Sequence, residues 1–296
     1  MKNPFEVGET YRNNLGEYEV ISIDEPNMTI QLEDGRTIET TVKLQARIWK
    51  RIKWEKRHKK QIKRAQRRGH RRKSKFKGLK DKDFQSGVKG TSWRARTGLG
   101  GLMADKLSEK TPYDFQSYAV YGRPENHIVL SDYYDKSDRW KSAKFVLDLN
   151  EERARYGFYI EKKADPEKIW DWSRFVEALS TDEDLQDDTE ETMRQMNLHW
   201  ELYSGEEADQ VLGWARIAGD EGLEWESADG ETEILTWDTF AELLQDLDED
   251  TWYHLYLCDV MEKDETIEQA RRIAELTTDI FRMLLPLYEA STQCDE

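Results

Sequence analysis

Residues 5–42 alternate between apolar and polar side chains in short runs that turn residues separate. "ETYRNN" is the first strand and ends in a turn at Leu15-Gly16. In "EYEVISID" the apolar members are Tyr18, Val20, Ile21 and Ile23, and "MTIQLE" and "RTIETTV" follow as further strands. Asp34-Gly35 is a strong hairpin signal between the last two runs. Four or five short strands in about forty residues are too few for a sandwich, so the pattern predicts a small, strongly bent barrel.

The period changes after this region. Leu44, Ile48 and Ile52 recur at the spacing of one helix face, which we expect to pack on the barrel. Beyond Trp54 apolar residues become sparse, while Lys, Arg and Gln favour a helix as far as Gly69. Like charges four residues apart oppose that helix. We therefore predict a marginal helix that becomes stable when a polyanion neutralises it.

Apolar runs return from Phe76 onward and mix strands with helices. A short helix is predicted near Leu99–Leu107. Further helices are predicted at 170–180, 187–198 and 236–247, and a long one from Glu265 to Ala290. Strands are predicted at 116–122, 127–134, 144–149, 156–162, 211–218, 223–227, 231–236 and 251–260. Because no regular βαβ alternation appears, the fold class is α+β.

The chain is thus predicted to have three parts. Residues 1–43 form a small all-β SH3-like barrel, and residues 44–80 form a basic helical arm or linker. Residues 81–296 form an acidic α+β domain with mainly antiparallel strands and a long C-terminal helix.

The N-terminal stretch resembles the SH3-like small barrels of the Tudor and KOW type. The resemblance depends on "GEYEVISID", "MTIQLEDGRTIE" and their turn spacing, and it covers 38 of the 296 residues. It implies binding of nucleic acid, a modified side chain or another protein. An aromatic cage for a methylated cation needs three or four clustered rings, and Phe5, Tyr11 and Tyr18 are the only rings before Trp49. A plain docking or structural barrel is the competing interpretation.

Charge is distributed very unevenly along the chain. The net charge is -16, yet residues 43–82 hold 20 Lys or Arg and two acids, whereas residues 181–265 hold 28 acids and three bases. A phosphate backbone relieves such positive self-repulsion and releases counterions. The competing interpretations are a solvated helix, an arm that folds onto the acidic half of the chain, or an arm that binds a protein or a membrane. Folding onto the acidic half can coexist with nucleic-acid binding, and the acidic half would then weaken that binding. The predicted nucleic-acid contacts are Lys56, Arg57, Lys59, Lys60, Lys63, Arg64, Arg67, Arg68, Arg71, Arg72, Lys73, Lys75, Arg94 and Arg96.

A glycine-rich stretch offers a second phosphate candidate. Gly98, Gly100 and Gly101 precede the predicted short helix, and a helix N-terminus attracts phosphate. Arg94 and Arg96 lie nearby in sequence. The spacing matches neither a Walker A loop nor the dinucleotide fingerprint, so a simple turn and helix start is the alternative.

A nuclease interpretation depends on three residues. Asp148 followed by Glu161-x-Lys163 resembles the metal-binding core of the PD-(D/E)xK nucleases, in which carboxylates hold Mg²⁺. However, a hairpin centred near Glu152 places Asp148 opposite Tyr156, about 17 Å from Glu161. One metal cannot bridge that distance, and Asp132 or Asp135 is the alternative carboxylate.

Other chemistry is weakly indicated. His254 and Cys258 share one face of a predicted strand, but two ligands do not make a zinc site. We predict no metal site and no cofactor, with Mg²⁺ required only by the nuclease alternative. The first residues lack an apolar signal core, no apolar run is long enough for a membrane span, and there are two cysteines. These features favour a cytoplasmic protein with no membrane partner.

The sequence therefore predicts a nucleic-acid-binding protein. The arm and the barrel are expected to contact the phosphate backbone of DNA or RNA, and the acidic domain to engage a protein partner. Enzymatic activity is not expected. A metal-dependent nuclease and a protein scaffold that binds no nucleic acid are the two alternatives.

Overall fold

The chain divides into two compact units, Met1–Arg67 and Arg68–Glu296, in the computed structural model. Each unit is described by itself. The described residues are 3–13, 16–32, 35–42, 45–46, 49, 74–85, 92–94, 98–118, 127–132, 143–164, 170–206, 208–219 and 222–292.

The first unit contains a four-stranded antiparallel sheet, the small sheet, with strands in sequence order. Its strands are β1 (Thr10–Asn13), β2 (Gly16–Asp24), β3 (Asn27–Leu32) and β4 (Thr37–Thr41). All four were predicted, but closure into a barrel was wrong, since no described pairing joins β1 to β4. The apolar side chains that a closed barrel would bury are covered by the helical residues Ala46 and Trp49.

The core of the small sheet follows from strand alternation. Val20 of β2 and Met28 and Ile30 of β3 point to the same side and are buried. Trp49 packs on this core, as expected for the helix that follows the sheet, and its ring lies 6.0 Å from that of Phe5. Leu44, Ile48 and Ile52, which predicted this packing, lie outside the described residues.

The second unit takes in the chain well before residue 81. Phe76 and Leu79 are buried, and the Ser74 hydroxyl donates to the carbonyl of Gly98. Arg271 reaches the carbonyl of Phe76 with one guanidinium nitrogen. Residues 74–80 therefore pack as part of the second unit.

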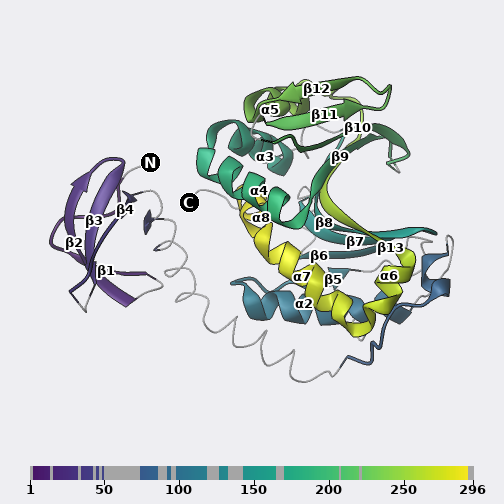
Figure 1. Cartoon of the computed structure of the whole chain (residues 1–296), viewed down its shortest axis with the longest axis horizontal. Helices are drawn as coiled ribbons and strands as arrows, with labels where there is room; N and C mark the ends of the chain where they lie inside the picture. Colours follow the sequence, from purple (N-terminus) through teal and green to yellow (C-terminus); the bar gives the residue numbers. More distant parts are fainter. Residues whose placement is uncertain are drawn as a thin grey trace. The chain divides into compact units, whose positions relative to one another are not determined.

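A nine-stranded antiparallel sheet forms the body of this unit (Figure 1). The strand order is β12-β11-β10-β9-β13-β8-β7-β6-β5. The last strand in sequence, β13, therefore lies between β9 and β8 and joins the strands β5 to β8 and the strands β9 to β12 into one sheet. The strands are β5 (Gln116–Tyr118), β6 (His127–Ser131), β7 (Lys144–Leu149), β8 (Arg153–Lys162), β9 (His199–Ser204), β10 (Gln210–Ile217), β11 (Leu223–Ser227), β12 (Thr232–Leu235) and β13 (Tyr253–Glu262). The sequence did not predict β9.

Helices cover one face of this sheet, as the arrangement of α3, α7 and α8 shows (Figure 1). On this covered face Phe145 stacks on Phe281 of α7, Phe158 contacts Phe175 of α3, and other rings extend the core. No described helix is long and apolar enough to cross a membrane. The helices are α2 (Leu99–Lys110), α3 (Trp170–Thr181), α4 (Glu183–Met196), α5 (Trp237–Gln245), α6 (Lys263–Glu268), α7 (Ile273–Met283) and α8 (Leu285–Thr292), with 3₁₀ turns at Asp81–Phe84, Ser92–Arg94 and Ala270–Arg272.

The single long C-terminal helix predicted from Glu265 to Ala290 was wrong. The first break lies at Ala270, which has a left-handed φ of 49°. The second break lies between α7 and α8, where Pro286 has no N–H to donate and its ring conflicts with the carbonyl four residues earlier. Apolar periodicity continued through both breaks and therefore hid them.

Candidate functional site

The face of the nine-stranded sheet opposite the helices is rich in ionisable and aromatic side chains. Strand alternation produces this polar face, because every second residue of β7, β8, β13 and β9 points away from the helix-packed rings. Its members are Lys144, Val146, Asp148, Arg155, Gly157, Tyr159, Glu161, His254, Tyr256, Cys258, His199, Glu201 and Tyr203.

Arg155 lies at the centre of this face. Its guanidinium donates to Oε2 of Glu201 at 2.7 Å and to Oδ2 of Asp148 at 2.9 Å. The same group lies 3.7 Å from the ring centroid of Tyr256. Burial alone would lower the pKa of Arg155, but the adjacent Asp148 carboxylate raises it well above its usual value. The guanidinium therefore stays charged and fully engaged by protein groups.

The two carboxylate oxygens of Glu201 have different partners. Oε2 accepts from Arg155 and from the hydroxyl of Tyr203 at 2.9 Å, while Oε1 lies 3.0 Å from Nε2 of His199. Burial opposes ionisation of Glu201, but the hydrogen bond from His199 and the charge of Arg155 outweigh it and lower the pKa to about 2. Glu201 is therefore an anion over the physiological pH range.

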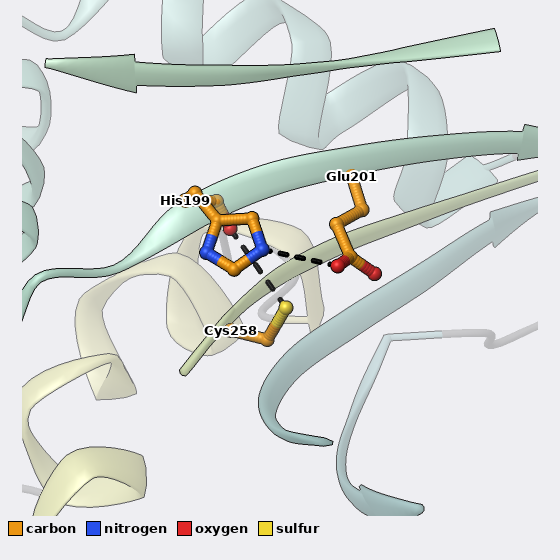
Figure 2. A group of neighbouring side chains, drawn as sticks. All are labelled: His199, Glu201 and Cys258. Carbon is orange, nitrogen blue, oxygen red and sulfur yellow. Dashed lines mark hydrogen bonds and ion pairs between the residues drawn. The ribbon is translucent and has the colours of Figure 1, made fainter. Parts of the chain in front are cut away.

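Cys258 completes this group from the neighbouring strand. It pairs with His199 in the β13–β9 register and is fully buried. Figure 2 shows its sulfur directed toward the two β9 side chains, and its thiol makes a weak 3.8 Å hydrogen bond to the His199 carbonyl. Burial, and next the negative charge of Glu201, raise the pKa of the Cys258 thiol well above its usual value. The thiol is neutral and is not activated as a nucleophile.

A second network lies farther along the same face. His254 contacts the Gly205 carbonyl through Nε2 at 2.8 Å and the Tyr159 hydroxyl through Nδ1 at 2.7 Å. A carbonyl only accepts, so Nε2 carries a proton, and burial lowers the pKa of His254. The Tyr159 hydroxyl also donates to Oε2 of Glu161 at 3.2 Å, so it contacts both the imidazole and the carboxylate. Glu161 pairs with Lys144 at 3.3 Å and Lys163 at 3.5 Å. Burial opposes its ionisation, but these two lysines lower the pKa of Glu161.

The structure does not bring the three nuclease candidates into one site. Asp148 pairs with Arg155, one position from the predicted Tyr156, and Glu161 lies six residues farther along β8, or about 20 Å. Glu161 and Lys163 do contact each other. The carboxylates hold separate cations, so this geometry offers no shared Mg²⁺ position.

The glycine-rich stretch has a packing explanation. Gly98 caps α2, and a Cβ on Gly100 would lie 2.2 Å from the Ser117 hydroxyl oxygen, so only glycine fits there. Arg94 is buried with 4% of its surface exposed, which leaves little of it for a phosphate backbone. Arg96 lies outside the described residues. A turn and helix start therefore accounts for the pattern.

Most of the predicted nucleic-acid contacts cannot be placed. Lys75 is described and exposed. The others lie outside the described residues, namely Lys56, Arg57, Lys59, Lys60, Lys63, Arg64, Arg67, Arg68, Arg71, Arg72 and Lys73.

Sequence reasoning missed His199 and Glu201, because β9 itself was not predicted. The signal was present in "HWELYS", where polar and apolar residues alternate. It was right that His254 and Cys258 share a strand face, but each interacts with a different neighbour. Comparison of the chain with protein-family models and with curated proteins finds no match.

Proposed function

We propose that this protein binds nucleic acid through the segment between residues 50 and 73, the basic arm. The observation that carries the proposal is charge: this stretch holds 14 Lys or Arg and one acid in a chain of net charge -16. Most charged protein surfaces mix both signs, and a run of one sign calls for a counter-charged partner. A phosphate backbone supplies that charge continuously and gains entropy by releasing counterions.

Structured anchors flank the basic arm. On its N-terminal side Trp49 packs among the rings of the small sheet. On its C-terminal side Phe76 and Leu79 are buried in the second unit. The charged residues thus begin and end where apolar side chains hold the chain, which favours a built-in binding segment over a free tail.

The small sheet is assigned a different role from the arm. Residues 1–42 contain nine acidic and three basic side chains, and among the described acids Glu17, Glu19 and Glu39 are exposed. Such a surface repels phosphate, so contact with the phosphate backbone falls to the basic arm and not to this sheet. Its four clustered rings also favour a structural role over an open cage, because Phe5 and Tyr18 have only 4% and 1% of their surface exposed.

A protein partner for the acidic unit is the second part of the proposal. Three large apolar side chains remain exposed on β10 and β12: Val211 at 37%, Trp214 at 37% and Ile234 at 47%. The strand register places Trp214 and Ile234 on the polar face, among Glu224, Glu226 and other charges. An aromatic and aliphatic patch with a charged rim is the usual composition of a protein-binding surface.

The decisive experiment measures binding of labelled single- and double-stranded DNA and RNA to the full chain over a range of salt concentrations. We expect a steep fall of log affinity with log salt, of about -0.9 per duplex phosphate contacted. Replacing Arg64, Arg67, Arg68, Arg71 and Arg72 together by Glu should weaken binding by at least tenfold.

A matched pair of variants separates the arm from net charge. Arg67→Glu with Arg68→Glu changes the total charge by the same amount as Arg12→Glu with Arg36→Glu on the small sheet. Only the arm pair should weaken binding substantially. A flat salt dependence, or equal losses in both pairs, contradicts nucleic-acid binding by the arm.

A further inference from the structure

The side chains of His199, Glu201 and Cys258 converge on one point of the polar face (Figure 2). Among the described residues they are the one group of His, Cys, Asp and Glu whose donor atoms, one per residue, all lie within 4.8 Å of one another. Backbone pairing fixes this arrangement. His199 and Glu201 are two residues apart on β9 and share its face, and Cys258 lies directly opposite His199 on β13.

The three donors are the nitrogen, oxygen and sulfur ligands that Zn²⁺ takes in proteins. Donors about 2.1–2.3 Å from a tetrahedral zinc lie about 3.4–3.8 Å from one another. Nε2 of His199 and Oε1 of Glu201 are 3.0 Å apart, and the third donor is within 4.8 Å of both. Small side-chain rotations, without any change in strand pairing, bring all three to coordination distance.

The surroundings already orient the Glu201 carboxylate for such a role. Arg155 and Tyr203 both donate to Oε2 and leave Oε1 directed toward His199. Asp148 in turn holds the other side of Arg155. Oε1 accepts the hydrogen bond of His199 Nε2, and a metal ion would replace that hydrogen bond once Nδ1 carries the imidazole proton. Groups that hold the second oxygen of a ligand carboxylate are the outer shell expected around a protein metal site.

Charge balance also favours a cation at this point. Asp148 and Glu201 share the guanidinium of Arg155, so these three residues carry one net negative charge. A zinc ion with a Cys258 thiolate adds one net positive charge and balances it, while the opposite charges of Arg153 and Asp259 near Cys258 offset each other. Without a metal, the buried Cys258 thiol has only one weak hydrogen bond in this network, and the ion replaces the thiol proton directly.

We propose that His199, Glu201 and Cys258 bind one Zn²⁺ per chain, with solvent at the fourth position. The side chain of His199 is 29% exposed, which gives the ion a route from solvent. Arg155 and Tyr203, which both donate to Glu201, also line a pocket of about 260 Å³ together with Asp148, so space for an exogenous ligand adjoins the groups that hold this carboxylate. Three protein ligands and an open position are the pattern of zinc sites that bind a further ligand.

The test uses the full chain, stripped with a chelator and then titrated with Zn²⁺ or Co²⁺. We expect one metal per chain and, with Co²⁺, a thiolate-to-metal charge-transfer absorption band. Cys258→Ser should abolish that band and weaken zinc binding by more than tenfold. Cys294→Ser is the matched control, since it removes the other cysteine of the chain, and should leave both properties unchanged.

His199→Gln is a second variant that is expected to fold, because the partly exposed imidazole is replaced by a polar group of similar reach. It should stay folded by circular dichroism and also bind zinc more than tenfold more weakly. Absence of stoichiometric zinc binding, or equal affinity in Cys258→Ser and the unmodified chain, overturns the proposal. His199 and Glu201 are then an ion pair beside a buried core thiol.

Discussion

The two faces of the nine-stranded sheet come from the same strands but are stabilised by different kinds of interaction. On β8, Phe158 points to the covered face and is fully buried among rings, whereas the next residue, Tyr159, points to the polar face and contacts His254. The covered face gains stability from apolar area removed from water. The polar face gains it only where each buried charge or hydroxyl has a partner.

This contrast identifies where function can reside. Aromatic packing dominates the covered face, while the polar face keeps the ionised Glu201 carboxylate and the neutral Cys258 thiol at fixed spacing. Perturbed pKa values in a polar cluster are a recognised signal of a functional site, although structural ion pairs produce them too. Substitutions on the two faces distinguish these roles.

The largest effect is expected on the covered face. Phe158→Ala removes a fully buried ring that contacts Phe145 and Phe175, and should lower the free energy of unfolding by about 4 kcal/mol. Urea unfolding followed by circular dichroism measures it. Ile234→Ala is the control, because that side chain is 47% exposed and its loss should cost less than about 1 kcal/mol. Similar costs for both variants would show that helix packing does not dominate the covered face.

The next effect is expected at the centre of the polar face. Arg155→Met leaves Asp148 and Glu201 without their shared cation and should cost about 3 kcal/mol of unfolding free energy. Adding Asp148→Asn and Glu201→Gln to the same chain should recover most of that loss, since no unpaired charge remains. Failure of the triple variant to recover stability would mean that Arg155 acts mainly through its packing on Tyr256.

A smaller, pH-dependent effect is expected at Glu161. Its folded pKa lies below the ordinary value of 4.5 because of Lys144 and Lys163. The carboxylate therefore stabilises the fold fully above that value and loses its contribution as the pH falls through the lowered folded pKa. Glu161→Gln should cost about 2 kcal/mol at pH 7 and progressively less in acid. Glu177→Gln, on the exposed side of α3, is the same substitution outside this ion-pair network, and as the control it should change the free energy of unfolding little at pH 7.

The smallest effect is expected from Tyr159→Phe. This change keeps the ring but removes the hydroxyl that contacts Nδ1 of His254 and donates to Oε2 of Glu161, and should cost about 1 kcal/mol. A double-mutant cycle with His254→Phe isolates the hydrogen bond from the packing of the two rings. A coupling energy near zero would show that this polar pair is structurally neutral.

Most strands and helices could be predicted from the sequence because each has a clear period. The antiparallel α+β class and the hairpin between β7 and β8 are confirmed. The break between α7 and α8 has a local signal in Pro286, which the continuing apolar period hid. Barrel closure and the position of β13 between β8 and β9 instead depend on which distant segment packs against a given face. Local periodicity carries no information about that choice.

The candidate site was less predictable than the fold. Arg155, His199 and Glu201 belong to no local motif, and their strands are separated by two helices in sequence. The residues that a motif did suggest, Asp148 and Glu161, hold separate cations in the structure. A motif match in one hairpin was therefore a weaker guide than the register of three non-consecutive strands.

The sequence by itself determined the small sheet's strands, the apolar periods of most helices and the concentration of positive charge between residues 50 and 73. These features depend on neighbours within a few residues, where side-chain period and charge act directly. Only the tertiary structure decided that β13 would pair with both β8 and β9, and so place Cys258 opposite His199 and beside Glu201. That decision depends on long-range strand pairing, which the burial of the whole sheet selects and no short segment encodes.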